Sequence, residues 1–172
     1  NNAGVQHVAG IEEFPIEKWN ELLHINLTAP FQLIQAVWPS MRKENFGRII
    51  NMASAHALVA SPYKSAYVSA KHGLLGLTKT AALEGAHHGI TVNAICPGYV
   101  DTKLVNAQIK DAAAKQGKSE IEVTHELFLQ KHAIREFVST ESIAALCLFL
   151  ASDAAASITG APFPVDAGWT AT

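Results

Sequence analysis

The stretch GRIINMAS, residues Gly47–Ser54, decides the fold class. Its apolar and β-branched part, Arg48–Ala53, is typical of a short strand that is buried on both faces of a sheet. A second run of this kind, ITVNAICPG over Ile90–Gly98, ends at a Pro-Gly pair that terminates a strand. Between the two runs, Lys64–Glu84 is predicted to form a helix. The strand–helix–strand order indicates a right-handed crossover and therefore a parallel sheet.

The remaining elements fit the same α/β pattern. They are a long helix over Pro15–Glu44 that is kinked or divided at Pro30, two amphipathic helices over Thr102–Gln116 and Glu120–His132 that join at Gly117, a helix capped by Thr140 that ends near Leu150, and a last strand around Phe163–Val165. The sequence contains no repeat and no linker. Residues 1–172 are therefore predicted to form a single domain with three parallel strands covered by helices.

The composition argues against several classes of partner. The 172 residues are 49% hydrophobic and 16% charged, with a formal net charge of -2, which is typical of a globular protein. There is no basic stripe of the kind that binds nucleic acid, and no apolar run reaches the ~20 residues of a membrane span. Cys96 and Cys147 have no motif spacing, which favours a reduced, cytoplasmic setting. The scattered histidines form no metal-binding pattern, so we expect no metal.

Tyr67 and Lys71 carry the strongest chemical signal. They are four residues apart on the helix predicted over Lys64–Glu84, so their side chains share one face of it. A lysine cation beside a tyrosine favours the phenolate and lowers the tyrosine pKa. Such a tyrosine can exchange a proton with a carbinol or carbonyl oxygen. Taken alone, a tyrosine and a lysine at this spacing are more often an ordinary helix residue and its solvated neighbour. The residues around them therefore decide between the structural and the functional interpretation.

Several surrounding residues favour the functional interpretation. Ser54 follows the first strand, at the edge where α/β folds place their ligands, and its hydroxyl can hydrogen-bond a carbonyl oxygen. The opening segment NNAG permits close approach of a ligand because its residues are small. Asn26 lies inside a predicted helix although asparagine is a mediocre helix former.

With these residues the whole chain resembles the short-chain dehydrogenase/reductase family. The resemblance implies a Rossmann-type, doubly wound parallel sheet and an NAD cofactor. It implies that Tyr67 is the general acid/base and that Ser54 polarises the carbonyl group. It also implies that Lys71 lowers the tyrosine pKa and holds the nicotinamide ribose, and that Asn26 supports a water between Lys71 and solvent. The residues that carry the resemblance or would contact the cofactor are Asn2, Ala3, Gly4, Asn26, Ser54, Tyr67, Lys71, Pro97, Gly98, Val100 and Thr102.

One feature of the family has no counterpart in the sequence. The glycines form no G-x-x-x-G-x-G turn between a strand and a helix, which is the site where the family binds the pyrophosphate. We therefore expect the chain to correspond to the C-terminal two-thirds of the family's fold. The part of the family's fold that distinguishes NAD from NADP has no counterpart in the sequence. The expected preference for NAD therefore comes from the resemblance alone.

Polar residues near the catalytic pair suggest the substrate. A cation and two amide donors beside a carbonyl site suit a small carboxylate-bearing ketone. Each of these residues alone is more often a solvated or core residue. Tyr99 and Trp169 are candidates for aromatic walls of the site. The resemblance implies that the carboxylate is held by Gln6, His56, Lys64 and Gln108, and that the helices of residues 102–132 form a mobile lid. The implied reaction is the reversible oxidation of D-3-hydroxybutyrate to acetoacetate with NAD.

Two other readings stay open. A 3-oxoacyl carrier-protein reductase, or another short-chain alcohol or sugar dehydrogenase, would share Ser54, Tyr67 and Lys71 without needing a carboxylate site. Alternatively, the chain is an inactive fragment that still assembles, because the apolar faces of Pro15–Glu44 and Lys64–Glu84 fit the family's dimer-forming helices. Either way a homo-oligomer, a dimer or a tetramer, is expected.

Overall fold

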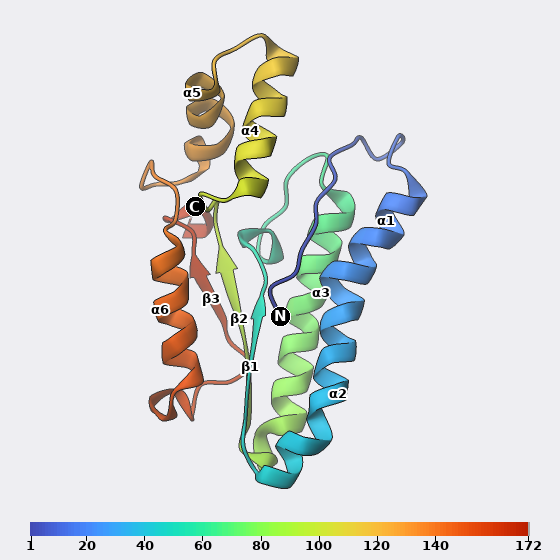
Figure 1. Ribbon diagram of the computed structural model, residues 1–172, viewed down its shortest axis with the longest axis vertical. Coiled ribbons are helices and arrows are strands. Elements are labelled where there is room, and N and C mark those ends of the chain that lie inside the picture. Colours follow the sequence, from blue (N-terminus) through green and yellow to red (C-terminus); the bar gives the residue numbers. More distant parts are fainter. Residues whose placement is uncertain (172) are drawn as a thin grey trace.

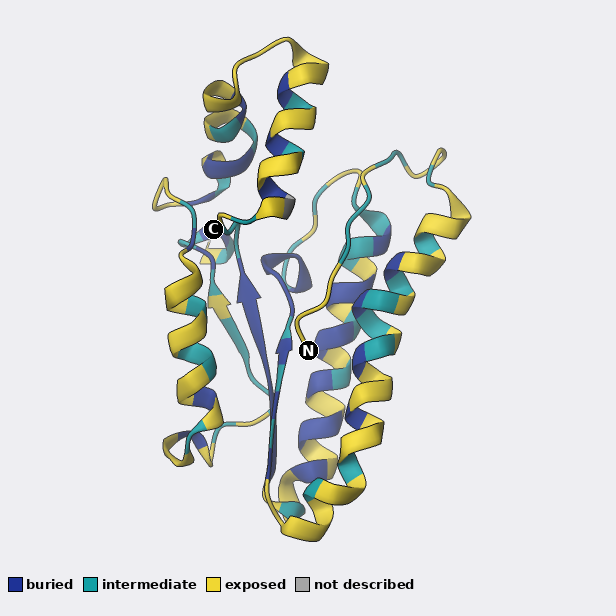
Figure 2. Ribbon diagram, viewed as in Figure 1, coloured by how far each residue is buried: buried dark blue, intermediate teal, exposed yellow. Residues whose placement is uncertain are grey.

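The computed structural model describes residues 1–171 and contains a three-stranded parallel sheet with helices packed on both faces (Figure 1). The strands are β1 (Gly47–Met52), β2 (Ile90–Pro97) and β3 (Pro162–Val165), in the spatial order β1-β2-β3. The strand β2 is central, and all of its residues are buried (Figure 2). The predicted parallel α/β sheet is confirmed, and each strand begins and ends within one residue of its predicted bounds.

Helices cover both faces of the sheet. The chain runs through α1 (Ile16–Leu23), a π-helical segment (His24–Thr28) and α2 (Ala29–Glu44), which pack beside α3 (Ser65–Gly85), while α6 (Thr140–Ala151) lies on the opposite face (Figure 1). The division expected at Pro30 falls at the π-helical segment directly before it. Pro30 lies in the first turn of α2, where a missing N–H costs little.

The N-terminal residue is attached to the outer edge of β1. The Asn1 amino group donates to the Ile50 carbonyl oxygen at 2.9 Å, and the Met52 N–H donates to the Asn1 carbonyl oxygen at 2.9 Å. The fully buried Asn51 side chain accepts from the Asn1 amide at 2.7 Å and donates to the Thr78 hydroxyl at 2.8 Å. These contacts position the first residues of the chain at the carboxyl end of the sheet.

Residues 102–132, the segment predicted to form a lid and called the lid below, lie above the carboxyl ends of the strands (Figure 1). The helix α4 (Lys103–Gln116) is capped by the Thr102 hydroxyl and ends at Gly117, whose φ of 63° is left-handed. The helix predicted over Glu120–His132 is wrong in part, because α5 covers only Glu120–Val123 and is followed by π-helical (Thr124–Phe128) and 3₁₀ (Leu129–Lys131) turns.

The irregular end of the lid takes part in packing. Phe128 and Leu129, at the junction of the π-helical and 3₁₀ turns, are both buried, so this irregular end is packed against the rest of the molecule. The lid has a core of its own, formed by Val105, Ile109, Ala113, Val123 and Phe128. It is therefore a small packed unit rather than two loose helices.

The cap of α6 also differs from the prediction. The Ser139 hydroxyl accepts from the Ser142 N–H at 3.1 Å, and Thr140 is the first helical residue instead of the cap. Among residues 1–171, no helix combines the length and the apolar character needed to cross a bilayer.

Candidate active site

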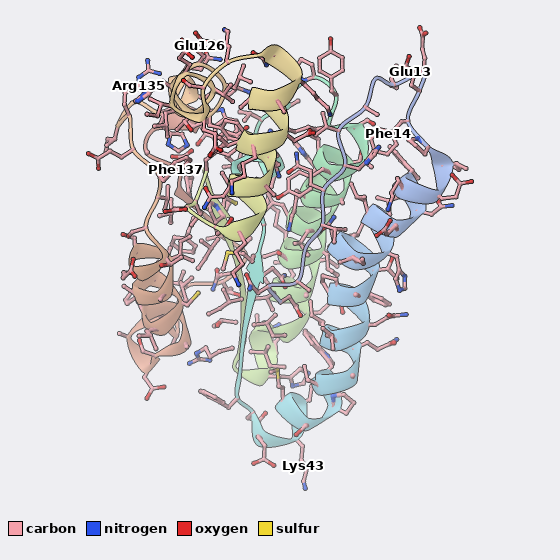
Figure 3. The ribbon with its side chains drawn as sticks, turned by 45° about the horizontal axis from the view of Figure 1, so that its top comes forward. Glu13, Phe14, Lys43, Glu126, Arg135 and Phe137 are labelled. Carbon is pink, nitrogen blue, oxygen red and sulfur yellow. The ribbon has the colours of Figure 1, made fainter. Side chains whose placement is uncertain are left out.

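Two cavities meet at the carboxyl ends of β1 and β2, below the lid. The larger has a volume of about 400 Å³ and the smaller about 80 Å³, and both are lined by Ser54, Tyr67 and Gly98. Figure 3 turns this end of the molecule forward, with Glu13 and Phe14 marking the N-terminal segment on one side, and with Glu126 marking the lid and Arg135 and Phe137 marking the segment after it on the other. The site thus lies where parallel sheets place their ligands.

Ser54, Tyr67 and Lys71 come together as the sequence predicts. Ser54 follows β1, and its hydroxyl accepts from the His56 N–H at 3.1 Å. Tyr67 and Lys71 are one turn apart on α3, with the Lys71 ammonium 5.6 Å from the centroid of the tyrosine ring. That ammonium donates to the Met52 carbonyl oxygen at 2.8 Å. Burial lowers the pKa of Lys71 to about 8.

The predicted lowering of the Tyr67 pKa is not found. Burial raises the pKa of the phenol, and a hydrogen bond with Ser54 acts in the opposite direction without overcoming it. Loss of hydration disfavours the phenolate more than its neighbours favour it. Tyr67 is therefore protonated at neutral pH in this arrangement.

The larger cavity collects nearly all of the predicted cofactor residues. Two of them are glycines in tight surroundings: a Cβ on Gly98 would lie 2.7 Å from Nε2 of His132, which leaves no room for it, and one on Gly4 would lie 3.1 Å from Oδ1 of Asn26, which would have to shift slightly. Ala3 is exposed and, within the described residues, lies outside the lining. The predicted residues in the lining are Asn2, Gly4, Tyr67, Lys71, Pro97, Gly98, Val100 and Thr102. Five further lining residues were not predicted, because nothing in the sequence distinguishes them from ordinary core and helix residues: Met52, Ala53, Val105, Thr140 and Ile143.

Asn26 lies behind this cavity instead of lining it, judged on the described residues. Its side chain is fully buried in the π-helical segment. Its Oδ1 accepts from the Val5 N–H at 3.1 Å, and its Nδ2 donates to the Val5 carbonyl oxygen at 2.9 Å. The amide therefore fixes the main chain between Gly4, which lines the larger cavity, and Gln6, which lines the smaller one.

All six predicted substrate residues line the smaller cavity: Gln6, His56, Lys64, Tyr99, Gln108 and Trp169. The Lys64 ammonium donates to the Tyr99 hydroxyl at 3.3 Å. The rings of Tyr99 and Trp169 are stacked, with centroids 5.2 Å apart and an interplanar angle of 15°. Burial and, second, the charge of Lys131 lower the pKa of Lys64 to about 8, so the amine is mostly charged at neutral pH and loses its charge just above it.

His56 links this cavity to two residues that the sequence analysis missed. Its Nδ1 lies 3.4 Å from the Ser54 hydroxyl and its Nε2 lies 3.0 Å from the Ser61 hydroxyl. Lys131, in the lid, donates to the same Ser61 hydroxyl at 2.7 Å. Burial, with the charges of Lys64 and Lys131, lowers the pKa of His56 to about 3, so the ring is neutral. Ser61 and Lys131 are 70 positions apart, and no motif connects them.

Several known proteins are similar in sequence to nearly the whole of this chain. The chain is 54% identical over 171 residues to a D-beta-hydroxybutyrate dehydrogenase of Rhizobium meliloti and 49% identical to one of Cupriavidus necator, covering 99% of this chain and 66% of each relative. An acetoacetyl-CoA reductase of Shinella zoogloeoides is 36% identical over 98% of this chain and 65% of its own length. The chain thus spans slightly less than two thirds of the relatives it matches.

The fold has equally clear counterparts. A solved actinorhodin polyketide ketoreductase with NADPH superposes with a TM-score of 0.93 at 29% identity, covering 100% of this chain and 66% of the other. The family model described as enoyl-(acyl carrier protein) reductase matches residues 1–170. Together with the arrangement of Ser54, Tyr67 and Lys71, these similarities show that the chain belongs to the short-chain dehydrogenase/reductase family, whose sheet is of the Rossmann type.

Proposed function

We propose that this chain carries the catalytic and substrate-binding part of an NAD-dependent dehydrogenase that interconverts D-3-hydroxybutyrate and acetoacetate. One observation carries the proposal: the cavity of about 80 Å³ brings Lys64, Gln6 and Gln108 to the same small space as Ser54 and Tyr67. A cation and two amides can hold a carboxylate while the hydroxyl and the phenol contact the oxygen that reacts. The buried Nε2–H of Gln6 has no hydrogen-bond partner among the described residues, which suits a donor awaiting an anion.

The larger cavity suits the nicotinamide end of the cofactor. When bound there, the nicotinamide ring accepts or donates the hydride. Its lining combines two glycines, Gly4 and Gly98, with the Lys71 ammonium, which is a suitable donor to ribose hydroxyls. The choice of NAD over NADP rests on the similarity to hydroxybutyrate dehydrogenases. Within the proposal, Asn26 acts by positioning the Gly4–Gln6 segment.

The protonation state of Tyr67 assigns it a role in each direction. Because burial raises its pKa, the phenol holds its proton at neutral pH and can deliver it to the ketone oxygen of acetoacetate. In the oxidation of the alcohol, the phenolate takes the proton of the substrate hydroxyl. Ser54 donates to the same oxygen and stabilises the charge that develops on it.

The free acid fits the smaller cavity better than an activated acyl group does. Tyr99 and Trp169 close one side of the cavity. The carrier group of a thioester would therefore have to extend through the outer cavity of about 470 Å³, which opens between the lid and residues 61–64. The 36% identity to an acetoacetyl-CoA reductase makes such a thioester the second candidate substrate.

A kinetic panel separates these candidates. Because residues 1–172 contain no pyrophosphate-binding turn, the assay would use them joined to the N-terminal third of a relative's fold, with NAD and with NADP, on D-3-hydroxybutyrate, its methyl ester and its CoA thioester. We expect the free acid with NAD to have the highest kcat/KM. Turnover of the thioester without turnover of the free acid would overturn the proposal.

We also propose that the protein is a cytoplasmic homo-oligomer, a dimer or a tetramer. A cavity of about 400 Å³ between α2 and α3 is lined by apolar residues that include Phe31, Trp38 and Leu77, and Phe31 is exposed. A second copy packed on these helices would cover that apolar surface. Sedimentation velocity measures the oligomeric state directly, and a monomer at all concentrations would exclude this part of the proposal.

A further inference from the structure

A continuous line of side chains connects the lid to Ser54. The Lys131 ammonium lies 2.7 Å from the Ser61 hydroxyl oxygen, which lies 3.0 Å from Nε2 of His56. The other ring nitrogen of His56, Nδ1, lies 3.4 Å from the Ser54 hydroxyl oxygen. Four side chains from three separate segments therefore form one hydrogen-bonded relay.

The lysine at its far end gives this relay a direction. An ammonium group has donors and no acceptor, so the Ser61 oxygen accepts from Lys131. The Ser61 hydrogen then points away from the cation, toward Nε2 of His56. The opposite arrangement, with Nε2–H also donating to Ser61, would place a second positive hydrogen against the same oxygen beside a cation. Lys131 therefore disfavours a proton on Nε2.

A neutral histidine carries one proton, so a bare Nε2 means that Nδ1 is protonated. The low pKa of His56, about 3, agrees with a neutral ring. The Nδ1–H of His56 then donates to the Ser54 oxygen, which also accepts from the His56 main-chain N–H at 3.1 Å. Both ring nitrogens are engaged in this way, so His56 lines the cavity without holding the carboxylate that the resemblance assigns to it. With its oxygen accepting twice, Ser54 has its own hydrogen left to donate to Tyr67 or to the substrate oxygen.

We propose that Lys131 is a positioning residue that holds His56 in its Nδ1–H tautomer and thereby makes Ser54 a hydrogen-bond donor at the reacting oxygen. The tautomer part of this inference stands on the geometry alone, and only its catalytic consequence rests on the proposed function. Because Lys131 belongs to the lid, the donor direction of Ser54 depends on where the lid lies. The Lys131 ammonium also lies 4.9 Å above the Trp169 ring, which helps to hold it in place.

Nitrogen NMR of the histidine rings tests the tautomer without any substrate. Long-range ¹H–¹⁵N spectra of the ¹⁵N-labelled protein distinguish protonated from bare ring nitrogens, and His56→Gln assigns the signals of His56. We expect Nδ1–H in the unchanged protein. Lys131→Met and Ser61→Ala should each produce a clear population of Nε2–H.

Two controls keep the result interpretable. Lys115→Met removes another lid lysine, one that pairs with Asp111 on the surface, and should leave His56 unchanged. His132 is an internal control for the fold in the same spectra. Its Nδ1 lies 2.8 Å from the Glu136 carbonyl oxygen and its Nε2 accepts from the Tyr99 N–H. It therefore keeps its proton on Nδ1 as long as the end of the lid is folded. An Nε2–H tautomer in the unchanged protein, or an unaltered His56 in Lys131→Met with His132 intact, would overturn the inference.

Kinetics then test the catalytic consequence. Lys131→Met should lower kcat about fivefold to tenfold, as expected for one misdirected hydrogen bond, with a smaller change in KM. Lys131→Arg keeps a cationic donor and should restore much of the rate. A shifted tautomer with an unchanged kcat would reject the role of Lys131 in catalysis. If the protein has no dehydrogenase activity, the proposed function fails, and the NMR spectra alone decide whether Lys131 sets the tautomer of His56.

Discussion

The Lys71 ammonium donates a hydrogen bond of 2.8 Å to the main-chain carbonyl oxygen of Met52, the last residue of β1. This contact ties α3 to the end of the sheet two residues before Ser54. It holds the cation in place through main-chain geometry, so most side-chain replacements nearby leave its position unchanged. The cation is therefore a fixed part of the site, available to a ribose and to a developing phenolate.

Replacement of Tyr67 by phenylalanine tests the acid/base role. Tyr67→Phe keeps the ring that packs against His56, whose centroid is 5.8 Å away, and removes the proton carrier. The turnover rate should fall by ~10²–10⁴-fold with little change in thermal stability. Tyr63→Phe, on the exposed loop before α3, is the matched control and should retain its rate. A Tyr67→Phe protein with more than about a tenth of the rate would show that another group moves the proton.

Lys64→Ala and Gln108→Ala test the carboxylate site. A charge-assisted hydrogen bond contributes ~1.5–3 kcal/mol, so each change should raise KM for 3-hydroxybutyrate by about tenfold or more. KM for an uncharged secondary alcohol of similar size should change much less. Lys110→Ala, on the exposed face of α4, serves as the control. Equal increases for both substrates would indicate a general loosening of the site.

The pKa of Lys64, about 8, predicts a pH effect with a definite sign. The amine is charged below this pKa and neutral above it, so binding of a carboxylate weakens as the pH rises through about 8. Lys71 titrates in the same range and affects every substrate. The ratio of kcat/KM for the acid to kcat/KM for an uncharged alcohol isolates Lys64, and this ratio should fall above pH 8.

The arginine variant is the control for that pH effect. Lys64→Arg keeps its charge throughout the range, so its ratio should stay flat. A flat ratio in the unchanged protein would mean that Lys64 does not hold the carboxylate.

Two glycine substitutions should change stability in opposite directions. A Cβ at Gly98 would lie 2.7 Å from Nε2 of His132 and 3.0 Å from the Asp166 Cα, so Gly98→Ala should destabilise the fold by ~1–3 kcal/mol. Gly76 lies inside α3 with open space around it among the described residues, so Gly76→Ala should stabilise by up to ~1 kcal/mol. Chemical denaturation measures both, and a neutral Gly98→Ala would mean that the strand end shifts freely.

The parts of the fold that follow from local pattern were predictable from the sequence. β1 and β2 are apolar β-branched runs, the second closed by Pro97-Gly98, and α3 keeps one helical period, so their bounds agree within a residue or two. The irregular end of the second lid helix was not predictable, because the local pattern of Glu120–His132 does not mark where the π-helical and 3₁₀ turns begin. The direction of the Tyr67 pKa depends on how deeply the phenol is enclosed, which spacing on a helix does not reveal.

The candidate site shows the same division. The sequence, with its family resemblance, identified Ser54, Tyr67, Lys71 and six residues that line the smaller cavity. It could not identify Ser61 or Lys131, because their contact joins a loop to the lid across 70 positions. Long-range pairs between ordinary surface residue types leave no trace in a single sequence.

The π-helical segment His24–Thr28 carries one residue more per turn than the helices on either side of it. Because the π turn takes up this extra residue, a deletion within it would let α1 and α2 join as one regular helix with their outer faces in nearly the same phase. The change would fall on the turn itself, where Asn26 makes its two hydrogen bonds to the main chain of Val5. The π turn is thus a local widening that serves one side chain, and protein engineers who shorten or splice this helix would need to preserve the turn to keep the segment between the two cavities in place.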